Sequence, residues 1–433
     1  MQKVLVLDKN QKPLMPTHPA RARALIRRGR AVVFRRYPFT IIVKDREGGA
    51  VQPVEIRIDP GSKTTGIALV AEGDRGSRVV FAQEIHHRGQ AIKRSLEKRR
   101  AIRRGRRTRN LRYRKPRFEN RTKAKGWLPP SLKSRVHNIE TWTRRFTRFA
   151  PVSSIADELV RFDLQKMQNP EISGVEYQQG TLFGYEVRQY LLEKWGRKCM
   201  YCSAENVPLE VEHIVAKSRG GSDRISNLGI SCNPCNQAKD NRPVEEFLSG
   251  KPERLVKIKK QVKAPLKDAA AVNATRFAVG RMLKKFGLPV SFWSGGRTKY
   301  NRTQQGYPKA HWIDAACVGD RGDSVFIPGG ATPLTATAMG HGSRQMCRVD
   351  KFGFPRTGPK GPRTVKGFRT GDIVKAIVGK GKRTGTYAGR VAVRSRGSFN
   401  IKTPSGLVTD IGWRWCRLLQ RADGFNYSQG EFT

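Results

Sequence analysis

Acidic residues are scarce in this sequence, which has 35 Asp and Glu against 85 Lys and Arg among 433 residues. It also has no run of about 18 apolar residues and no long basic amphipathic helix, so we expect no association with a membrane. The first apolar run, Val4–Leu7, begins without a signal peptide. Cys317, Cys347 and Cys416 lack the paired spacing of a disulfide framework. We therefore expect a cytoplasmic protein in a reducing compartment.

The excess of positive charge indicates a polyanionic partner. The formal net charge is +50 and the sequence pI is about 10.9. No fold requires this imbalance, and a chain that repels itself so strongly is expected to bind nucleic acid. At roughly 100 to 200 residues per domain, the length indicates about three domains.

The four other cysteines form two Cys-x2-Cys pairs, Cys199 with Cys202 and Cys232 with Cys235. Four thiolates at this spacing supply the closed tetrahedral set that structural zinc prefers. Four reduced thiols without a metal are the alternative, but paired Cys-x2-Cys units have no packing rationale. We expect a structural Zn²⁺ at these residues.

Glu212, His213, Asn227 and Asn236 lie between or just beyond the two cysteine pairs. A carboxylate and an amide oxygen are hard ligands that suit Mg²⁺, and a neighbouring imidazole can take a proton from an attacking water. Together with the two cysteine pairs, these residues resemble the HNH endonucleases. The ββα-metal core of those enzymes places the histidine on a hairpin and the last ligand on the following helix. The resemblance implies His213 as general base, Glu212 and Asn236 as ligands of one Mg²⁺, and Asn227 as the residue that braces the loop.

A second set of chemically active residues is spread over three distant segments. An apolar strand ends at Asp59, a short acidic strand carries Glu158, and His311 and Asp314 lie three residues apart on a predicted helix. These motifs resemble those of RuvC-type nucleases with the RNase H fold, which hold two Mg²⁺ ions about 4 Å apart. The resemblance implies that all four residues are catalytic and that the three carboxylates bind Mg²⁺. Two neighbouring acids remain alternatives to Glu158, namely Asp157 and Asp163.

Between the first two of these motifs, nearly half the residues from Arg88 to Lys125 are basic. An isolated peptide of this composition would be disordered. Helix formers from Gln90 to Arg104 nevertheless predict a helix, and its basic residues surround the axis, so phosphates are the partner expected to order it. We expect an arginine-rich helix that binds RNA or an RNA/DNA duplex through Arg99, Arg100, Arg103, Arg104, Arg106, Arg107, Arg109 and Arg112.

Periodicity predicts further elements toward the two ends of the sequence. The first 50 residues contain Pro13-Leu14-Met15-Pro16 and a basic helix. A strand at Val290–Trp293 precedes a basic turn from Arg297 to Arg302. Beyond Asp323, short strands with basic hairpin tips, the last around Trp413 and Trp415, predict a small SH3-like barrel.

The order of these parts resembles the IscB family across nearly the whole chain. These are transposon-associated, RNA-guided DNA endonucleases related to the type II CRISPR effector nuclease. The resemblance implies an α+β multidomain fold with an RNase H-like (RuvC) core split in three, an inserted bridge helix and an inserted HNH domain. The implied parts are an N-terminal PLMP domain (1–50), RuvC segments (51–86, 127–175 and 253–322), the arginine-rich bridge helix (87–126), the HNH domain (176–252) and a basic, β-rich C-terminal domain (323–433).

The same resemblance implies a function. A guide RNA, the ωRNA, pairs with one strand of double-stranded target DNA; HNH cuts that strand, and RuvC cuts the displaced strand. The C-terminal domain reads a short motif beside the target, and the protein is a monomer within a ribonucleoprotein. Two other classes stay open. A guide-free structure-specific or homing endonuclease would not need the arginine-rich helix, and a non-catalytic RNA-binding zinc protein would not need the two acidic sites.

Overall fold

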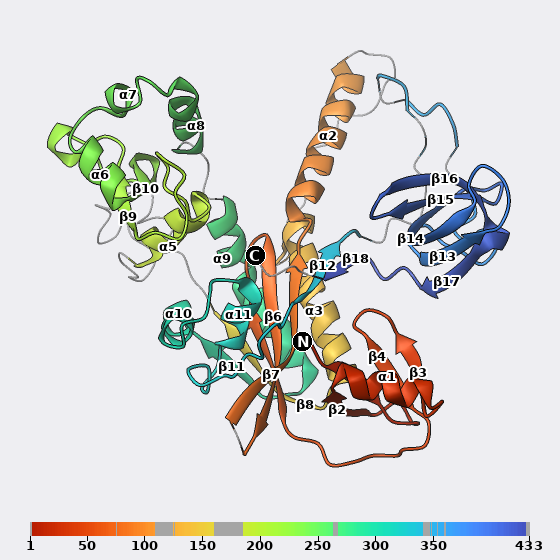
Figure 1. The fold of residues 1–433 in the computed structure, drawn as a ribbon. Helices are drawn as coiled ribbons and strands as arrows, with labels where there is room; N and C mark the ends of the chain where they lie inside the picture. The colour runs from red at the N-terminus through yellow and green to blue at the C-terminus, as the bar shows by residue number, and fades with distance from the viewer. Residues whose placement is uncertain are drawn as a thin grey trace. The chain divides into compact units, whose positions relative to one another are not determined.

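The computed structural model of the protein (Figure 1) describes residues 2–74, 76–108, 124, 126–159, 185–262, 267–340, 347, 349–352, 354–358 and 361–429. The chain forms two compact units. The first consists of Met1–Leu159 with Phe277–Thr433, and the second of Val160–Arg276. The second unit is therefore inserted, in sequence, between two parts of the first. Within the described residues, no helix combines the length and the apolar character needed to cross a membrane.

A seven-stranded sheet forms the centre of the first unit, in the order β11-β8-β5-β6-β7-β12-β18. β5, β6 and β7 are antiparallel neighbours, whereas β8 runs parallel to β5, and β11 parallel to β8. On the other side, β12 is parallel to β7, and β18 is antiparallel to β12. The strands are β5 (Val54–Asp59), β6 (Thr64–Gly73), β7 (Gly76–His86), β8 (Val152–Glu158), β11 (Val290–Trp293), β12 (Leu334–Ala338) and β18 (Phe425–Gln429).

The two faces of this sheet carry different layers, because successive side chains of a strand point in opposite directions. Ile67 of β6 packs in a core with Trp142 of α3 (Pro130–Phe149). Its neighbour Ala68 packs in a separate core with the short helix α11 (His311–Ala316). The sheet thus lies between α3 on one face and α11 on the other.

The basic segment 297–302, expected as a turn, lies inside helix α10 (Gly295–Gln304). Ser294 explains the difference, because its Oγ accepts a hydrogen bond from the backbone N–H of Arg297 at 3.3 Å and so caps the helix. The preceding α9 (Lys267–Leu283) runs into a 3-10 turn, η4 (Lys284–Phe286), and Gly287 ends it in the left-handed region with φ +71°.

The N-terminal part of the first unit is a four-stranded sheet in the order β2-β1-β4-β3 with one helix. Val4 packs in the small core of this module, whereas its neighbour Leu5 packs in the core of the central sheet. The module therefore shares one face with the central core. Its elements are β1 (Val4–Leu7), β2 (Pro13–Thr17), α1 (Pro19–Arg27), β3 (Ala31–Arg35) and β4 (Thr40–Val43).

The C-terminal part contains a separate five-stranded antiparallel sheet in the order β16-β15-β14-β13-β17, built around Phe399 and Ile401. The expected strand at Trp413 and Trp415 is wrong, since these residues form a 3-10 turn, η5 (Trp413–Trp415), that leads into the last strand. β12 and β18, also in this sequence range, belong to the central sheet instead. The strands are β13 (Ile373–Val378), β14 (Gly385–Val393), β15 (Ser398–Thr403), β16 (Gly406–Gly412) and β17 (Cys416–Gln420).

The second unit is a two-stranded hairpin surrounded by short helices. Its core gathers buried side chains from the hairpin, from α5 and from the loops that carry the cysteines. Ile258 of α8 packs in this core, beyond the boundary at 252 that the sequence suggested. The elements are α5 (Tyr185–Lys194), β9 (Leu209–His213), η2 (Lys217–Arg219), η3 (Ile225–Asn227), β10 (Leu228–Cys232), α6 (Asn233–Lys239), α7 (Val244–Phe247) and α8 (Pro252–Val262).

Candidate functional site

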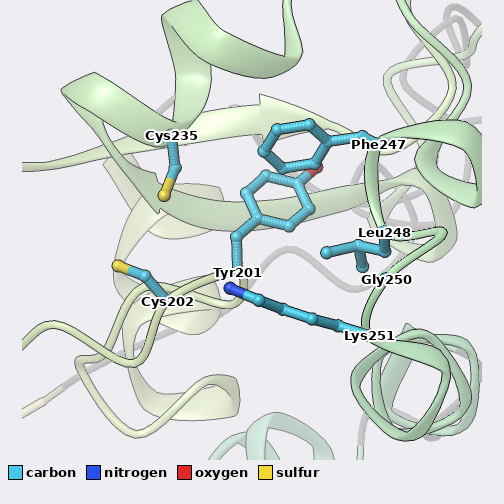
Figure 2. A pocket seen from close by; sticks show the side chains of 7 residues that line it. All are labelled: Tyr201, Cys202, Cys235, Phe247, Leu248, Gly250 and Lys251. Atoms are coloured by element: carbon cyan, nitrogen blue, oxygen red, sulfur yellow. The ribbon is translucent and has the colours of Figure 1, made fainter.

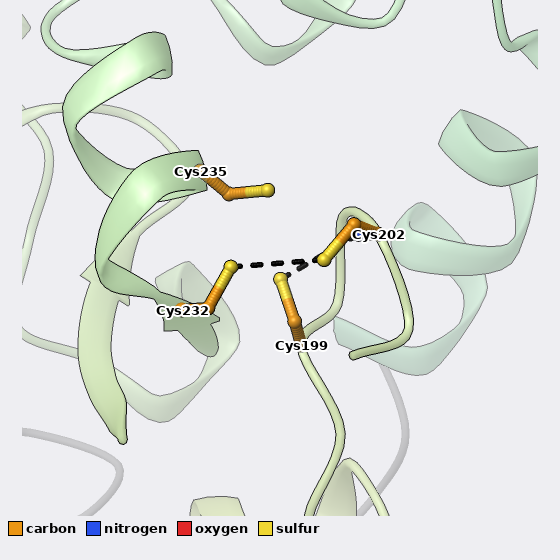
Figure 3. Close-up of side chains that lie close together, drawn as sticks. All are labelled: Cys199, Cys202, Cys232 and Cys235. Atoms are coloured by element: carbon orange, nitrogen blue, oxygen red, sulfur yellow. Dashed lines mark hydrogen bonds between the residues drawn. The ribbon is translucent and has the colours of Figure 1, made fainter. Parts of the chain in front are cut away.

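The four paired cysteines lie close together in the second unit (Figure 3). Their Sγ atoms are all within 4.8 Å of one another, and those of Cys202 and Cys232 are 3.6 Å apart. Tetrahedral Zn²⁺ with Zn–S bonds of about 2.3 Å requires sulfur atoms about 3.8 Å apart. Burial opposes ionisation of Cys199, but backbone N–H groups of the cluster lower the pKa of its thiol to about 7. The spacing and the donor set therefore fit a structural zinc ion.

A small pocket of about 180 Å³ lies beside two of these cysteines (Figure 2). The rings of Tyr201 and Phe247 meet edge to face there, with centroids 5.1 Å apart, and the aliphatic stem of Lys251 runs along the opposite side. Pockets that bind drug-sized ligands have volumes of about 300–1,000 Å³. This pocket is smaller, so we assign it no substrate.

The hairpin of β9 and β10 is followed immediately by α6, which gives the second unit a ββα arrangement. His213 is the last residue of β9, and its Nε2 lies 2.7 Å from Oδ1 of Asp223 in the loop between the strands. The other carboxylate oxygen of Asp223 is 3.0 Å from Nζ of Lys217. Hydrogen bonds from His213 and then Lys217 lower the pKa of Asp223. The predicted base therefore faces an ionised carboxylate.

Glu212, a predicted metal ligand, is buried beside a buried lysine. Its Oε1 lies 2.9 Å from Nζ of Lys239, whose side chain is 0% exposed. The same Nζ donates a hydrogen bond to the backbone carbonyl of His213 at 3.0 Å. Burial raises the pKa of Glu212, although Lys239 acts in the opposite direction. Lys239 thus ties the end of α6 to the last two residues of β9.

Asn236, the other predicted ligand of this site, contacts a different carboxylate. Its Nδ2 donates to Oε2 of Glu210 at 2.9 Å, and Nδ2 of Asn233 donates to Oε1 of Glu210 at 3.2 Å. Glu210 and Glu212 are two residues apart on β9 and so project from the same face. The hydrogen bond uses the amide nitrogen of Asn236, which leaves its Oδ1 as the atom suited to a cation.

Asn227 joins the two sides of the loop that carries Asp223. Its Oδ1 accepts from the backbone N–H of Val215 at 2.9 Å, and its Nδ2 donates to the carbonyls of Val215 at 3.0 Å and Ser222 at 2.9 Å. One amide side chain therefore closes the loop through three hydrogen bonds, which holds Asp223 near His213.

The first unit brings a second group of predicted residues together at the ends of two parallel strands. In the register of β5 and β8, Ile58 lies opposite Asp157, and Asp59 and Glu158 follow them. Asp59 and Glu158 are both 8% exposed. Because side chains alternate along a strand, Asp157 projects from the opposite face to Glu158. The geometry therefore puts Glu158 beside Asp59.

Helix α11 supplies the other two residues of this group. Nδ1 of His311 lies 2.8 Å from Oδ2 of Asp59, and Asp314 is buried one turn further along. Oδ1 of Asp314 is 2.8 Å from Nε of Arg302 on α10, and Lys309 contacts its other oxygen. Asp59, Glu158, His311 and Asp314 are thus assembled from three segments that are distant in sequence.

The charges of this group act on one another. Burial, reinforced by the charges of Asp59 and Asp314, raises the pKa of Glu158 to about 8. Burial also raises the pKa of Asp314. For Asp59, burial is outweighed by His311, and the pKa is lowered. Burial holds the pKa of Asp157 well above the ordinary value, although the charge of Arg135 acts in the opposite direction. Glu158 therefore shares a site with Asp314, and Asp163 lies outside the described residues.

The arginine-rich segment forms helix α2 (Gly89–Thr108), as its composition predicts. None of its described side chains is buried, and Arg99, Arg100, Arg103 and Arg104 are exposed. Some arginines bond only to the preceding turn, as when Nε of Arg103 donates to the carbonyl of Arg99 at 3.3 Å. The side chains of Arg106 and Arg107, and the whole of Arg109 and Arg112, lie outside the described part of the chain.

Several residues of both sites were not assigned a role from the sequence. Lys239 follows Asn236 by three residues and so lies on the same face of a short helix. That spacing could have indicated that Lys239 belongs to the site. Asp223, Glu210, Lys309 and Arg302 gave no such signal, because charged residues are common in so basic a chain. Only the fold shows that these side chains contact the predicted catalytic residues.

Two parts of the chain match known families. Residues 4–180 match a family described as RRXRR protein, and residues 199–242 match the family described as HNH endonuclease. The first range contains Arg103-Arg104-Gly105-Arg106-Arg107 of α2. The second contains the four cysteines and the ββα arrangement. The chain therefore carries an HNH endonuclease domain.

No curated protein matches the chain. Among solved structures, Streptococcus thermophilus Cas9 in complex with the GGAA PAM matches 61% of this chain and 32% of its own length, at 13% identity and a TM-score of 0.20. The same Cas9 with the AGAA PAM matches at 14% identity with equal coverage and score. The chain thus covers about a third of the length of those proteins, and a TM-score of 0.20 does not establish a shared fold.

Proposed function

We propose that this protein is an RNA-guided double-stranded DNA endonuclease of the IscB type. Its HNH site cuts the strand that pairs with the guide, and a RuvC-like site cuts the displaced strand. The observation that carries the proposal is the assembly of Asp59, Glu158, Asp314 and His311 at one place in a chain that also carries an HNH endonuclease domain. A non-catalytic zinc protein has no use for that assembly.

The central sheet supports the RuvC-like assignment. Three antiparallel strands, β5, β6 and β7, are extended beyond β5 by the parallel strands β8 and β11. Because β8 runs parallel to β5 and pairs with it, these two strands end side by side. In this chain those two ends carry Asp59 and Glu158, so the topology accounts for their proximity.

Both sites offer donors that fit Mg²⁺. Three crowded carboxylates, Asp59, Glu158 and Asp314, would hold two ions. Burial, together with the charges of Asp59 and Asp314, raises the pKa of Glu158, and a bound cation would oppose that rise. Glu212 and Oδ1 of Asn236 would hold one ion in the HNH site. Bound Mg²⁺ would supply Lewis-acid charge to the phosphate and the attacking water.

The carboxylate beside each histidine determines which of its ring nitrogens can act as the base. A carboxylate beside Nε2 of His213 keeps a proton on that nitrogen, so Nδ1 is the atom that takes a proton from water. In the RuvC-like site, Nδ1 of His311 faces Asp59, so Nε2 is the corresponding atom. Asp223 and Asp59 thus orient the two bases in opposite tautomers.

RNA guidance rests on charge and exposure. The net charge is +50, and α2 exposes its described arginines, from Arg94 to Arg104, to solvent. Phosphate groups would neutralise the charge of such a helix and so stabilise it, and a structured guide RNA would supply those phosphates. The five-stranded C-terminal sheet would form an SH3-like module that reads a motif beside the target, with basic residues at the tip between β13 and β14, namely Lys380, Lys382 and Arg383.

The first test is the nucleic acid that accompanies the protein. The protein is purified from its native context, and the bound nucleic acid is sequenced. A single structured RNA with a variable end is expected, and DNA complementary to that end should then be cleaved. Random or absent nucleic acid would contradict RNA guidance and favour a guide-free structure-specific or homing endonuclease.

The second test assigns each strand to a site. With labelled strands of a matched target, Asp59→Ala should leave only the cut in the guide-paired strand, and His213→Ala only the cut in the displaced strand. The double variant is the control for contaminating nucleases. Loss of both cuts in either single variant, or of neither, would contradict the division of labour.

A further inference from the structure

The helix that carries His311 and Asp314 is too short to hold itself in place. α11 has six residues, and its N-cap position, Ala310, has no side chain able to accept a hydrogen bond from the first turn. Helices of this length are unstable alone, and their terminal N–H and C=O groups need outside partners. The position of both catalytic side chains therefore depends on what binds the two ends of α11.

Glu84 of β7 provides the partner at the N-terminal end. Its Oε1 accepts a hydrogen bond from the backbone N–H of Trp312 at 3.4 Å. In the sheet register, Glu84 lies opposite Gly66, and Gly66 lies opposite Asp59, so the three positions form one line across three strands. A negative charge at this end also has the sign that the helix dipole favours.

Arg57 of β5 provides the partner at the C-terminal end. Its Nη1 donates to the backbone carbonyl of Ala316 at 2.9 Å, and its side chain is 1% exposed. Glu55 and Glu72 hold the guanidinium, with oxygens 2.8 Å from Nε and 3.0 Å from Nη2. A cation at the last carbonyl again matches the helix dipole. Opposite charges on two strands thus fix the two ends of one helix.

Gly66 allows these contacts to form. A Cβ at this position would lie 1.9 Å from the carbonyl oxygen of His311, so α11 rests directly on the backbone of β6. Between the side chains of Asp59 and Glu84, the glycine leaves the space that the first turn of α11 occupies.

We propose that Glu84 is a positioning residue of the RuvC-like site, which holds the first turn of α11 so that His311 and Asp314 face Asp59. Arg57 holds the other end. This inference rests on the proposed function of that site. Glu84 acts through the backbone of α11 and takes no part in the chemistry itself.

The test compares Glu84→Ala, Glu84→Gln and the surface control Glu47→Ala. Gln keeps an oxygen that can accept from Trp312, whereas Ala does not. The first readout is the ratio of displaced-strand to guide-paired-strand cleavage, because the HNH cut in the same molecule reports folding and guide loading. We expect the ratio to fall by about 10- to 100-fold in Glu84→Ala, because loss of a residue that orients a metal ligand typically lowers metal affinity or activity by that factor. Glu84→Gln should recover most of it.

The second readout needs no nucleic acid. Mn²⁺ should raise the melting temperature of the first unit, and Glu84→Ala should require about tenfold more Mn²⁺ than wild type or Glu47→Ala for half of that rise. Equal ratios and equal Mn²⁺ responses in Glu84→Ala and wild type would overturn the positioning role, as would an equal loss of both cuts. A wild type that neither responds to Mn²⁺ nor cuts either strand would overturn the proposed function, and the positioning role with it.

Discussion

Oδ2 of Asp59 lies 2.8 Å from Nδ1 of His311, although 252 positions separate the two residues in the chain. The contact forms because β5 ends at Asp59 and α11 begins at His311, directly above Gly66 on the adjacent strand. The whole second unit lies between these residues in sequence. The proposed RuvC-like site is therefore complete only when parts of the chain on both sides of the HNH domain have folded together.

Gly66→Ala should selectively damage this site. The added methyl group would have to share space with the carbonyl of His311, so α11 must move away from β6. Overpacking of this kind costs about 1–3 kcal/mol. We expect displaced-strand cleavage to be lost while guide-paired cleavage remains. Gly296→Ala on α10, where a Cβ meets only Oγ of Ser294 at 4.0 Å, is the matched control. Normal displaced-strand cleavage by Gly66→Ala would show that α11 can lie elsewhere.

Lys239→Met should destabilise the HNH domain. The substitution leaves Glu212 buried without its cation, and breaking a buried ion pair costs about 3–5 kcal/mol. Lys217→Met is the control, because its pair with Asp223 is exposed and such pairs contribute about 0–1 kcal/mol. Chemical unfolding of the second unit, followed by tryptophan fluorescence, measures both. Equal midpoints for the two variants would mean that Lys239 contributes little to stability.

Removal of zinc should unfold the second unit and spare the first. Zinc sites of four cysteines contribute about 10–16 kcal/mol of apparent binding free energy at neutral pH. We expect one Zn²⁺ per chain by elemental analysis and none in Cys199→Ser/Cys232→Ser. Calorimetry of the chelated protein should lose one transition and keep the other. A zinc-free protein with both transitions intact would rule out a structural zinc ion at this cluster.

The stability of the first unit without Mg²⁺ should decrease as the pH rises. The pKa of Glu158 is raised from its ordinary value of 4.5 to about 8 in the folded protein. Between these values the unfolded chain has released this proton while the folded protein still holds it. The unfolded state then binds fewer protons, so the free energy of unfolding falls across this window.

Glu158→Gln removes this titration and should flatten the decrease. The measurement is the urea midpoint of zinc-loaded, Mg²⁺-free protein at pH 5, 6.5 and 8, with the exposed Glu47→Gln as control. If wild type and Glu158→Gln show the same slope with pH, burial does not raise the pKa of Glu158 in solution.

The sequence carries local motifs at both candidate sites but gives no indication of what surrounds them. The strand ending at Asp59, the short strand at Glu158 and the helix at His311 each carry a local motif. A local motif can be recognised from the sequence alone. Glu84 and Arg57 carry none, because their roles depend on which strand lies beside which. Such pairing is set by the fold and not by the neighbours of a residue in sequence.

The misassigned elements have similar causes. Trp413 and Trp415 alternate like residues of a strand, but residues 413–415 form a 3-10 turn before β17 begins. β18 has an ordinary strand pattern, yet no periodicity reveals that it pairs with β12 in the central sheet. In the HNH domain, no local pattern shows that the register of β9 brings Glu210 to the amide nitrogen of Asn236.

The interrupted central sheet also constrains the order in which the protein can fold during synthesis. β5, β6, β7 and β8 leave the ribosome first, but β11, β12 and β18 pair with them only after the inserted unit has been made. The HNH domain is contiguous in sequence and can fold as soon as it emerges. The first unit must meanwhile persist with the edges of β8 and β7 unpaired, and exposed strand edges invite aggregation. A nascent chain of this protein can therefore hold a folded HNH domain before the proposed RuvC-like site exists.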